Sequence, residues 1–251
     1  MRMAFADYFS RDSHAYAKFR PRYPESLFDW VAALPAGRQL AWDAGTGTGQ
    51  AASMLGARFD RVIASDASSA QVKAAGRGAR VQYFAGTAEA SALRPGRVDL
   101  VTMAQAFHWV DQPRFYAEVS RILAPGGALA VWCYATLIAG PAIDALVTPF
   151  YRDTVGPYWP AERVHVDRGF RDYEIPIDEV AMPEMAIECA LNLPAFLGYV
   201  RTWSAVGRFI AVKGYDPVDE LGGALGAIWG DPDTPTPITW PIAMRAGRWT
   251  R

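Results

Sequence analysis

Short apolar segments rich in β-branched residues alternate with longer segments of helical periodicity through the first half of the chain. This alternation is typical of βαβ units and of a parallel sheet. The predicted strands are residues 40–44, 62–65, 81–85, 98–105 and 128–134. The predicted helices between them are residues 49–58, 68–76 and 112–123, and the run Pro125-Gly126-Gly127 marks the end of the last one.

The pattern becomes irregular after residue 134. Helices are predicted over residues 141–152, 194–203 and 217–229, and strands over residues 185–191 and 238–245. Residues 154–179 are rich in proline, charged and aromatic side chains, which indicates an insertion over a site. Before the first strand, an amphipathic N-terminal segment is expected to cover the sheet, with Pro24 opening a helix that reaches residue 34.

Composition and charge narrow the possible partners. Hydrophobic residues make up 51% of the 251 residues, so the chain has an ample core and is not a disordered tail. The 25 basic and 26 acidic residues nearly cancel, which disfavours nucleic acid as the main partner. The two cysteines, Cys133 and Cys189, form neither a disulfide framework nor a zinc motif, and no metal is expected. No membrane helix or signal sequence is recognised, so we expect a cytoplasmic protein without a membrane partner.

A glycine-rich turn, DAGTGTG at residues 43–49, joins the first predicted strand to the first predicted helix. Such a turn lets the backbone approach a ligand closely and presents free N–H groups at the helix start. Alone it also fits a plain tight turn, but the next strand ends at Asp66, where a carboxylate can accept hydrogen bonds from ribose hydroxyls. The spacing GxGxG differs from the dinucleotide fingerprint GxGxxG, no Walker lysine follows, and no Tyr-x-x-x-Lys pair is present. A nucleoside ligand is therefore predicted, and a nicotinamide enzyme is a poor second.

Four segments, in order and spacing, resemble the motifs of class I S-adenosylmethionine-dependent methyltransferases. They are DAGTGTG with Asp66, GTAE at residues 86–89, VDLVTMAQAFHW at residues 98–109 and RILAPGGALAVW at residues 121–132. The segments YAKFRPRYP (residues 16–24) and QAFHW (residues 105–109) resemble the small-molecule branch, methyltransferase type 11, which includes trans-aconitate methyltransferases and relatives acting on heteroaromatic metabolites. The resemblance is strong over about residues 9–134 and loose beyond them. Ala44 departs from the Leu, Val or Ile that relatives often carry, without consequence for the turn.

The resemblance implies an α/β fold, with a Rossmann-like, seven-stranded, mostly parallel sheet, helices on both faces and a small cap over the active site. It implies a single methyltransferase domain over residues 1–251. Within it, residues 1–38 form the N-terminal cover, residues 39–134 the cofactor-binding core and residues 154–203 a substrate cap insertion.

The resemblance also assigns S-adenosyl-L-methionine to the carboxyl edge of the sheet, where open α/β sheets bind ligands. Around the methionine part it places Asp43, Gly45, Thr46, Gly47 and Gln105, the last beside the sulfonium. Around the nucleoside it places Asp66 on the ribose, Ala67 on one adenine face, and Ala88 and Glu89 on the adenine edge. From the N-terminal cover it adds Tyr16 and Arg20, with Phe19 and Tyr23 as further candidates that core packing explains as well. Arg20 would pair with the cofactor carboxylate or form a surface salt bridge.

Methyl transfer from a sulfonium is an in-line displacement, to which an enzyme contributes mainly by alignment. A general base is needed only when the acceptor must lose a proton. His108 follows the fourth predicted strand at its carboxyl end and is the candidate catalytic base. The alternative is that His108 fixes its loop through backbone hydrogen bonds, while His14 and His165 are weaker candidates.

Aromatic side chains are the candidates for contact with the acceptor, namely Phe9, Trp109, Trp132, Trp159 and Trp203. Ring faces suit a planar heteroaromatic or phenolic metabolite, although for any single ring packing in the core is the favoured interpretation. Three arginines of the insertion, Arg163, Arg168 and Arg171, instead suit a small carboxylic acid, but interleaved acidic residues also fit a solvated loop. An RNA or protein methyltransferase is disfavoured by the neutral charge and by the lack of an Asn-Pro-Pro-Tyr motif. The expected partner is a small-molecule substrate, and the chain is expected to be a monomer or homodimer.

Overall fold

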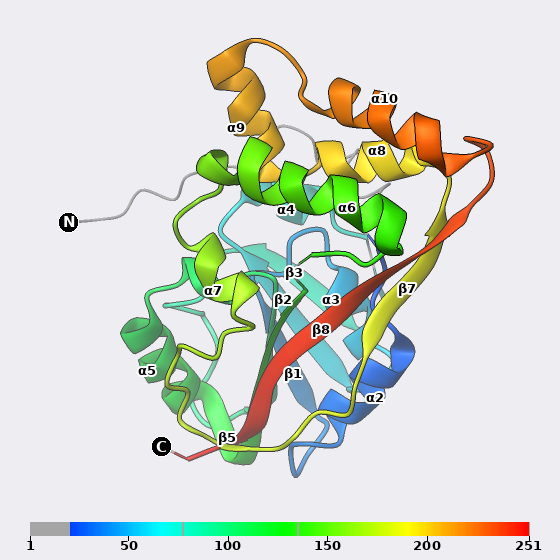
Figure 1. Ribbon diagram of the computed structural model, residues 1–251. Coiled ribbons are helices and arrows are strands. Elements are labelled where there is room, and N and C mark those ends of the chain that lie inside the picture. Colours follow the sequence, from blue (N-terminus) through cyan, green and yellow to red (C-terminus); the bar gives the residue numbers. More distant parts are fainter. Residues whose placement is uncertain (1–20, 77, 135, 251) are drawn as a thin grey trace.

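A twisted mixed sheet forms the centre of the computed structural model, which describes residues 21–76, 78–134 and 136–250 (Figure 1). Seven strands follow the order β3-β2-β1-β4-β5-β8-β6, and β7 pairs with β8 as an eighth. The strands are β1 (Leu40–Ala44), β2 (Arg61–Asp66), β3 (Val81–Ala85), β4 (Val98–Ala104), β5 (Leu123–Tyr134), β6 (Ile177–Glu179), β7 (Ala186–Leu191) and β8 (Thr236–Trp249). Strands β1 to β5 pair in parallel, and β8 runs antiparallel to β5, β6 and β7. The predicted Rossmann-like sheet is confirmed.

Helices cover both faces of the sheet. They are α2 (Glu25–Ala32), α3 (Gln50–Leu55), α4 (Ser69–Ala74), α5 (Gln112–Ile122), α6 (Pro141–Pro149), α7 (Arg163–Asp167), α8 (Leu193–Arg201), α9 (Ser204–Lys213) and α10 (Val218–Trp229). The short helical turns are η1 (Phe107–Trp109), η2 (Phe150–Thr154) and η3 (Gly156–Tyr158). Alternate residues of the strands serve opposite faces: Leu100 and Trp132 pack with α2 and α3, whereas Val101 and Val131 pack with α5 and α7.

Local sequence signals set where several helices begin and end. The Asp111 side chain accepts a hydrogen bond from the Arg114 N–H at 3.2 Å and so caps α5, and Asn192 caps α8 by accepting from the Ala195 N–H at 3.0 Å. Helix α5 ends at Ile122, three residues before Pro125, the first residue of the Pro-Gly-Gly run that was predicted to stop it. That run lies at the start of β5, which begins earlier than predicted.

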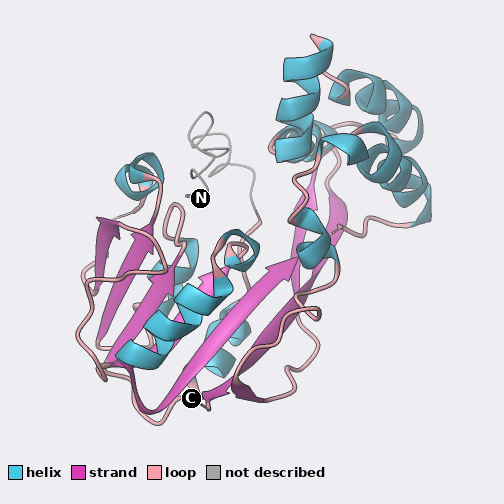
Figure 2. Ribbon diagram, turned by 90° about the vertical axis from the view of Figure 1, so that its left-hand side faces the viewer, coloured by secondary structure: helices cyan, strands magenta, loops and turns pink. Residues whose placement is uncertain are grey.

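A helical cap lies beyond the carboxyl end of β5, formed by α6, α8, α9 and α10 (Figures 1 and 2). Buried aromatic contacts hold it, including a hydrogen bond of 2.8 Å from Trp240 Nε1 to Tyr199 Oη. The cap thus draws on segments outside the expected residues 154–203. The helix predicted over residues 194–203 ends at Arg201, and a separate helix, α9, begins at Ser204 because Trp203 adopts an extended backbone (ψ 130°) between them.

Candidate functional site

The glycine turn between β1 and α3 leaves one open face. Gly45 and Gly47 have φ of +66° and +57°, a region that glycine enters without strain. A Cβ at Gly45 would lie 2.6 Å from the Ala106 Cβ, so this position needs glycine for packing. A Cβ at Gly47 would meet no atom of the described residues within 4 Å. Within the described part of the chain, the backbone at Gly47 is therefore open to close approach by a ligand.

Asp43, at the end of β1, is buried beside this turn with 1% exposure. Its carboxylate accepts hydrogen bonds from Thr46 Oγ1 at 2.6 Å and Thr102 Oγ1 at 2.8 Å. Burial raises the pKa of Asp43 from 3.8 to about 6; the two threonine hydrogen bonds oppose the rise, and the charge of Asp66 adds to it. A carboxylate in this state is stabilised by a cationic neighbour. The chemistry of Asp43 therefore fits the ammonium group of a methionine moiety.

Asp66, the last residue of β2, points its carboxylate at the same turn. Its Oδ2 accepts from the Gly47 N–H at 2.9 Å and its Oδ1 from the Ser68 N–H at 2.8 Å. Ala67 follows with an exposed side chain. The predicted ribose-binding acid and adenine-covering alanine thus lie side by side at the carboxyl edge of the sheet.

The remaining predicted nucleoside contacts lie after β3. Ala88 is 8% exposed, and the half-buried Glu89 accepts from the Asp111 N–H at 3.0 Å through its Oε1. This bond connects the segment after β3 to the start of α5. Among the described residues, no hydrogen bond is made to its Oε2, which leaves this oxygen to a further donor.

Gln105 follows β4 in a left-handed backbone conformation, with φ of +55°. Its N–H donates to the Trp132 carbonyl at 2.8 Å, and its Nε2 donates to the Tyr134 carbonyl at 2.8 Å. A non-glycine residue at this φ costs energy and is held by its surroundings, a pattern that concentrates at functional sites. This strain adds an independent signal to the predicted role of Gln105, and the sequence did not reveal it.

His108 lies in η1, directly beyond Gln105, and is 8% exposed. Its ring contacts Trp109 (centroids 4.6 Å apart) and stacks near Phe170 (6.1 Å). Among the described residues, its Nδ1 has no hydrogen-bond partner. Burial lowers the pKa of His108 from 6.5 to about 3, and the nearby charges of Arg163 and His165 contribute. The imidazole is therefore neutral at neutral pH, suited to a hydrogen bond but weak as a base in the absence of ligand.

The predicted acceptor rings that the structure describes differ in their surroundings. Trp109 is half-buried beside His108, whereas Trp132 is fully buried between Tyr23 (5.8 Å) and Phe28 (6.1 Å) in the core. Trp159 and Trp203 lie 5.9 Å apart in the cap. Three further candidates, Phe9, Tyr16 and Arg20, lie outside the described residues, as do Phe19 and His14.

Two residues of the site were not singled out from the sequence. Thr102 binds the buried Asp43, and its only signal was a hydroxyl within an otherwise apolar strand. Tyr151 binds Arg163 and Asp167 in the cap, and no local pattern distinguished it from other aromatic residues.

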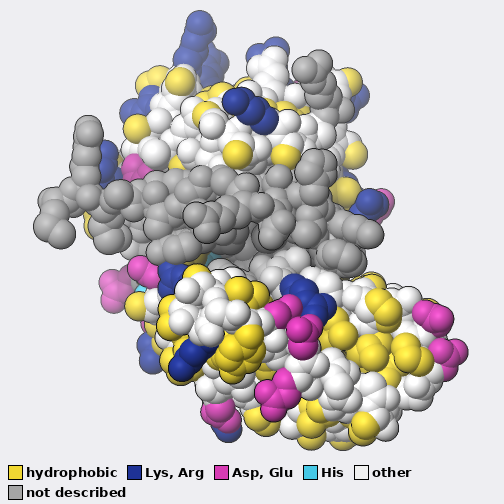
Figure 3. Space-filling model, turned by 90° about the horizontal axis from the view of Figure 1, so that it is seen from above, with side chains coloured by type: hydrophobic (Ala, Val, Ile, Leu, Met, Phe, Trp, Pro, Cys, Tyr) yellow, Lys and Arg dark blue, Asp and Glu magenta, His cyan; other side chains and the backbone are white. Residues whose placement is uncertain are grey.

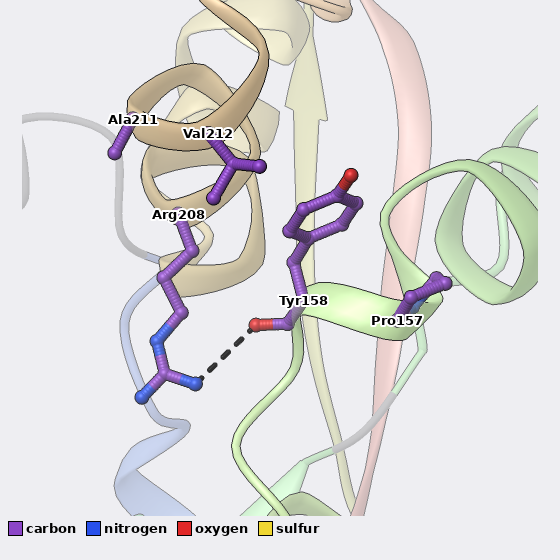
Figure 4. A pocket seen from close by; sticks show the side chains of 5 residues that line it. All are labelled: Pro157, Tyr158, Arg208, Ala211 and Val212. Carbon is purple, nitrogen blue, oxygen red and sulfur yellow. Dashed lines mark hydrogen bonds between the residues drawn. The ribbon is translucent and has the colours of Figure 1, made fainter.

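A hollow of about 500 Å³ opens on the cap between η3 and α9 (Figure 4). Its walls come from Pro157, Tyr158, Arg208, Ala211 and Val212, and Arg208 Nη1 donates to the Tyr158 carbonyl at 3.5 Å. None of the described residues that were predicted to bind the cofactor lines it. A second hollow of about 300 Å³ lies between α7 and β8, lined in part by Val166, Asp167 and Ile242.

The distribution of charged and apolar side chains over the described residues gives little indication of other kinds of ligand, such as a metal ion or a membrane. Seen from above, hydrophobic side chains are scattered among charged ones of both signs (Figure 3). Within residues 21–76, 78–134 and 136–250, no three metal-ligating side chains cluster. No helix in the described part of the chain is long and apolar enough to cross a membrane.

Comparison with known proteins identifies the family to which this chain belongs. Residues 42–131 match the Methyltransf_11 family, described as a methyltransferase domain. A provisionally named methyltransferase of Dictyostelium discoideum is 32% identical over 221 residues, which span 86% of this chain and 84% of the relative. An uncharacterised methyltransferase of Mycobacterium tuberculosis is 42% identical over 121 residues, or 47% of this chain and 49% of the relative. Among solved structures, a provisionally named type II methyltransferase of Anaeromyxobacter dehalogenans superposes with a TM-score of 0.86 at 43% identity, over 92% of this chain and 98% of that one.

Proposed function

Because the chain belongs to the class I S-adenosylmethionine-dependent methyltransferases, in the Methyltransf_11 family, we propose that it methylates nitrogen or oxygen of a planar heteroaromatic or phenolic small molecule. When bound, S-adenosylmethionine supplies an electrophilic methyl carbon: the acceptor lone pair forms the new bond, and the electrons of the broken S–CH₃ bond stay on sulfur. All other contributions come from the protein side chains and backbone.

The observation that carries the proposal is the convergence of four features at the carboxyl edge of β1, β2 and β4. The open backbone at Gly47, the oriented carboxylate of Asp66, the buried Asp43 and the strained Gln105 occupy one end of the sheet. In open α/β sheets this is the end at which ligands bind. We assign Gly45, Thr46 and Gly47 to the methionine part and Asp66, Ala67, Ala88 and Glu89 to the nucleoside.

We assign His108 to the acceptor side of the site. Its neutral imidazole accepts a hydrogen bond from the acceptor O–H or N–H and so orients the attacking lone pair. As the methyl group bonds to the acceptor atom, the O–H or N–H proton on that atom becomes strongly acidic, so it passes to the imidazole despite the low pKa of about 3 and from there to solvent. Alignment supplies most of the rate, because oriented reactants reach effective molarities of about 10⁵–10⁸ M.

We assign Trp109 to the acceptor ring. It is half-buried in η1 next to His108, so one flat face can orient a planar molecule near the imidazole. Trp132 lies deeper, in the core behind β5, and would support the site floor without touching the acceptor ring.

Incubation of the protein with S-adenosylmethionine and a panel of phenols and nitrogen heteroaromatics tests the proposal. We expect some members of the panel to gain the mass of one methylene. His108→Asn should slow that turnover about 10- to 100-fold, the lower end of general-base contributions, and change the Kd of S-adenosylhomocysteine less than about threefold. Equal turnover in His108→Asn would leave alignment as the sole contribution, and methylation confined to non-aromatic acceptors would refute the acceptor class.

A further inference from the structure

Neighbouring side chains hold Arg163, the first residue of α7, in one conformation without a ligand. Its Nε donates to Tyr151 Oη at 2.9 Å and to Asp167 Oδ1 at 3.3 Å. Its guanidinium carbon lies 4.7 Å from the Trp159 ring centroid and 5.6 Å from that of Tyr151. Stacking on two rings fixes the plane of the guanidinium. The side chain is 19% exposed, so it keeps access to its surroundings while its conformation is restricted.

The outer edge of this guanidinium is unused. Among the described residues, no hydrogen bond is made by Nη1 or Nη2 of Arg163, and the contact with Asp167 is a single one through Nε. Asp167 Oδ1 also accepts from Tyr151 Oη at 2.8 Å, so the carboxylate is shared between two donors. A planar guanidinium can bind two oxygens of one carboxylate with parallel hydrogen bonds. The Nη edge is free for that purpose.

Arg163 lies at the same end of the sheet as His108. Helix α7 packs against both β5 and η1, and the charge of Arg163 reaches His108 and Cys133 strongly enough to affect their pKa values. Nδ1 of His108 is a second polar atom without a partner in the described part of the chain, on a side chain that is more than nine-tenths buried. His108 Nδ1 on η1 and the Nη edge of Arg163 on α7 thus lie near each other, and neither has a hydrogen-bond partner among the described residues.

The other two arginines of the insertion lack this arrangement. Arg168 is 61% exposed and pairs with Asp172 at 3.3 Å, and Arg171 is exposed. The structure therefore separates one clamped arginine from two solvated ones, which the sequence treated alike.

We propose that Arg163 binds a carboxylate of the acceptor, so that the preferred substrate is an aromatic acid. The bound carboxylate is a recognition group, and the methylated atom is a separate nitrogen or oxygen near His108. Because Asp167 already offsets part of the charge of this guanidinium, the site suits a singly charged carboxylate better than a doubly charged phosphate. This inference rests on the proposed function and specifies the substrate class of the same site.

A matched pair of probes tests the inference: 4-hydroxybenzoate and 4-hydroxybenzamide, which share ring and phenol and differ in charge. Calorimetry uses the full chain with saturating S-adenosylhomocysteine. We expect the acid to bind at least about tenfold more tightly than the amide, a charge-assisted bidentate pair being worth about 1.4 kcal/mol or more. Arg163→Gln should abolish this preference, Arg163→Lys should restore part of it by its charge, and the control Arg168→Gln should retain it.

Several results would overturn the inference. The first is that the wild-type protein binds the two probes equally or binds neither. The second is that the acid preference survives in Arg163→Gln. The third is that Arg163→Gln loses affinity equally for acid and amide, as a purely structural role in the cap requires. Methylation of 4-hydroxybenzoate at the same rate by wild type and Arg163→Gln would reject the role of Arg163 and leave the proposed function standing. Failure of the wild-type protein to bind S-adenosylhomocysteine would instead reject the proposed function.

Discussion

Burial controls the protonation of the two ionisable side chains that border the site from β1 and η1. Asp43 has a raised pKa and His108 a lowered one, so each is driven toward its neutral form. The physical consequences differ. Asp43, with a pKa of about 6, is a carboxylate at neutral pH that a cation would stabilise, whereas His108 stays neutral and offers one donor and one acceptor nitrogen. Asp43 is therefore suited to a charged ligand group, and His108 to a hydrogen-bonding one.

The lowered pKa of His108 makes stability depend on pH. Between about pH 6.5 and 3 the unfolded chain binds a proton that the native imidazole does not, so stability is lost as the pH falls through this window. From pH 7 to pH 5 the loss amounts to about 2 kcal/mol. His108→Asn should lack this contribution, so its unfolding free energy relative to wild type should rise by that amount over the same interval.

Urea unfolding of both proteins at several pH values measures the difference. Asp43 contributes a slope of opposite sign, because a raised pKa favours the native state at low pH, but that slope is common to wild type and variant. Stability curves that stay parallel from pH 7 to pH 5 would show that His108 is not a buried neutral imidazole.

The turn between β1 and α3 is the element to which we assign the cofactor. The two glycines of this turn have different roles. Gly45 allows close packing against Ala106, whereas a Cβ at Gly47 would meet no atom of the described residues within 4 Å. The turn is fixed to β2 by hydrogen bonds from the Thr46 N–H to the Ser65 carbonyl and from the Gly47 N–H to Asp66, both 2.9 Å long. A change at Gly47 therefore acts on the ligand face with little effect on packing.

Gly47→Ala should weaken S-adenosylhomocysteine binding at least about tenfold, because the added methyl would enter the ligand space. The positive φ should cost about 1–2 kcal/mol of stability, so the variant should still fold. Gly223→Ala in α10, where a Cβ also meets no atom within 4 Å, is the matched control. It should gain about 0.5–1 kcal/mol and keep wild-type affinity. Calorimetry that gives Gly47→Ala the affinity of the control would remove the turn from the binding site.

At the scale of the whole molecule, the sheet and the cap differ in how far the sequence predicts them. Strands 40–44 and 81–85 match the predicted bounds, because apolar runs between turn signals report directly on a buried parallel sheet. The acid at the end of β2 was predictable for the same reason, since its position depends on one strand and one turn.

The cap and the acceptor side depend on contacts between distant segments, and local patterns do not encode these. Arg163 is distinguished from Arg168 only by Tyr151 and Trp159, which η2 and the following loop bring to it. The sequence predicts Trp132 as a site residue, but its position on β5 turns its side chain into the core, where it is fully buried. The positive φ of Gln105 likewise arises from hydrogen bonds to β5, which no run of residues around it predicts.

The central claim is that S-adenosylmethionine binds at the carboxyl edge of β1 and β2, with Asp66 on its ribose. Titration of S-adenosylhomocysteine into wild type, Asp66→Ala and Asp60→Ala tests it most directly, because Asp60 lies exposed at the opposite end of β2. Loss of a hydrogen-bonded carboxylate acceptor predicts at least about a tenfold higher Kd for Asp66→Ala and an unchanged Kd for Asp60→Ala. Equal affinity of Asp66→Ala and wild type would contradict the account.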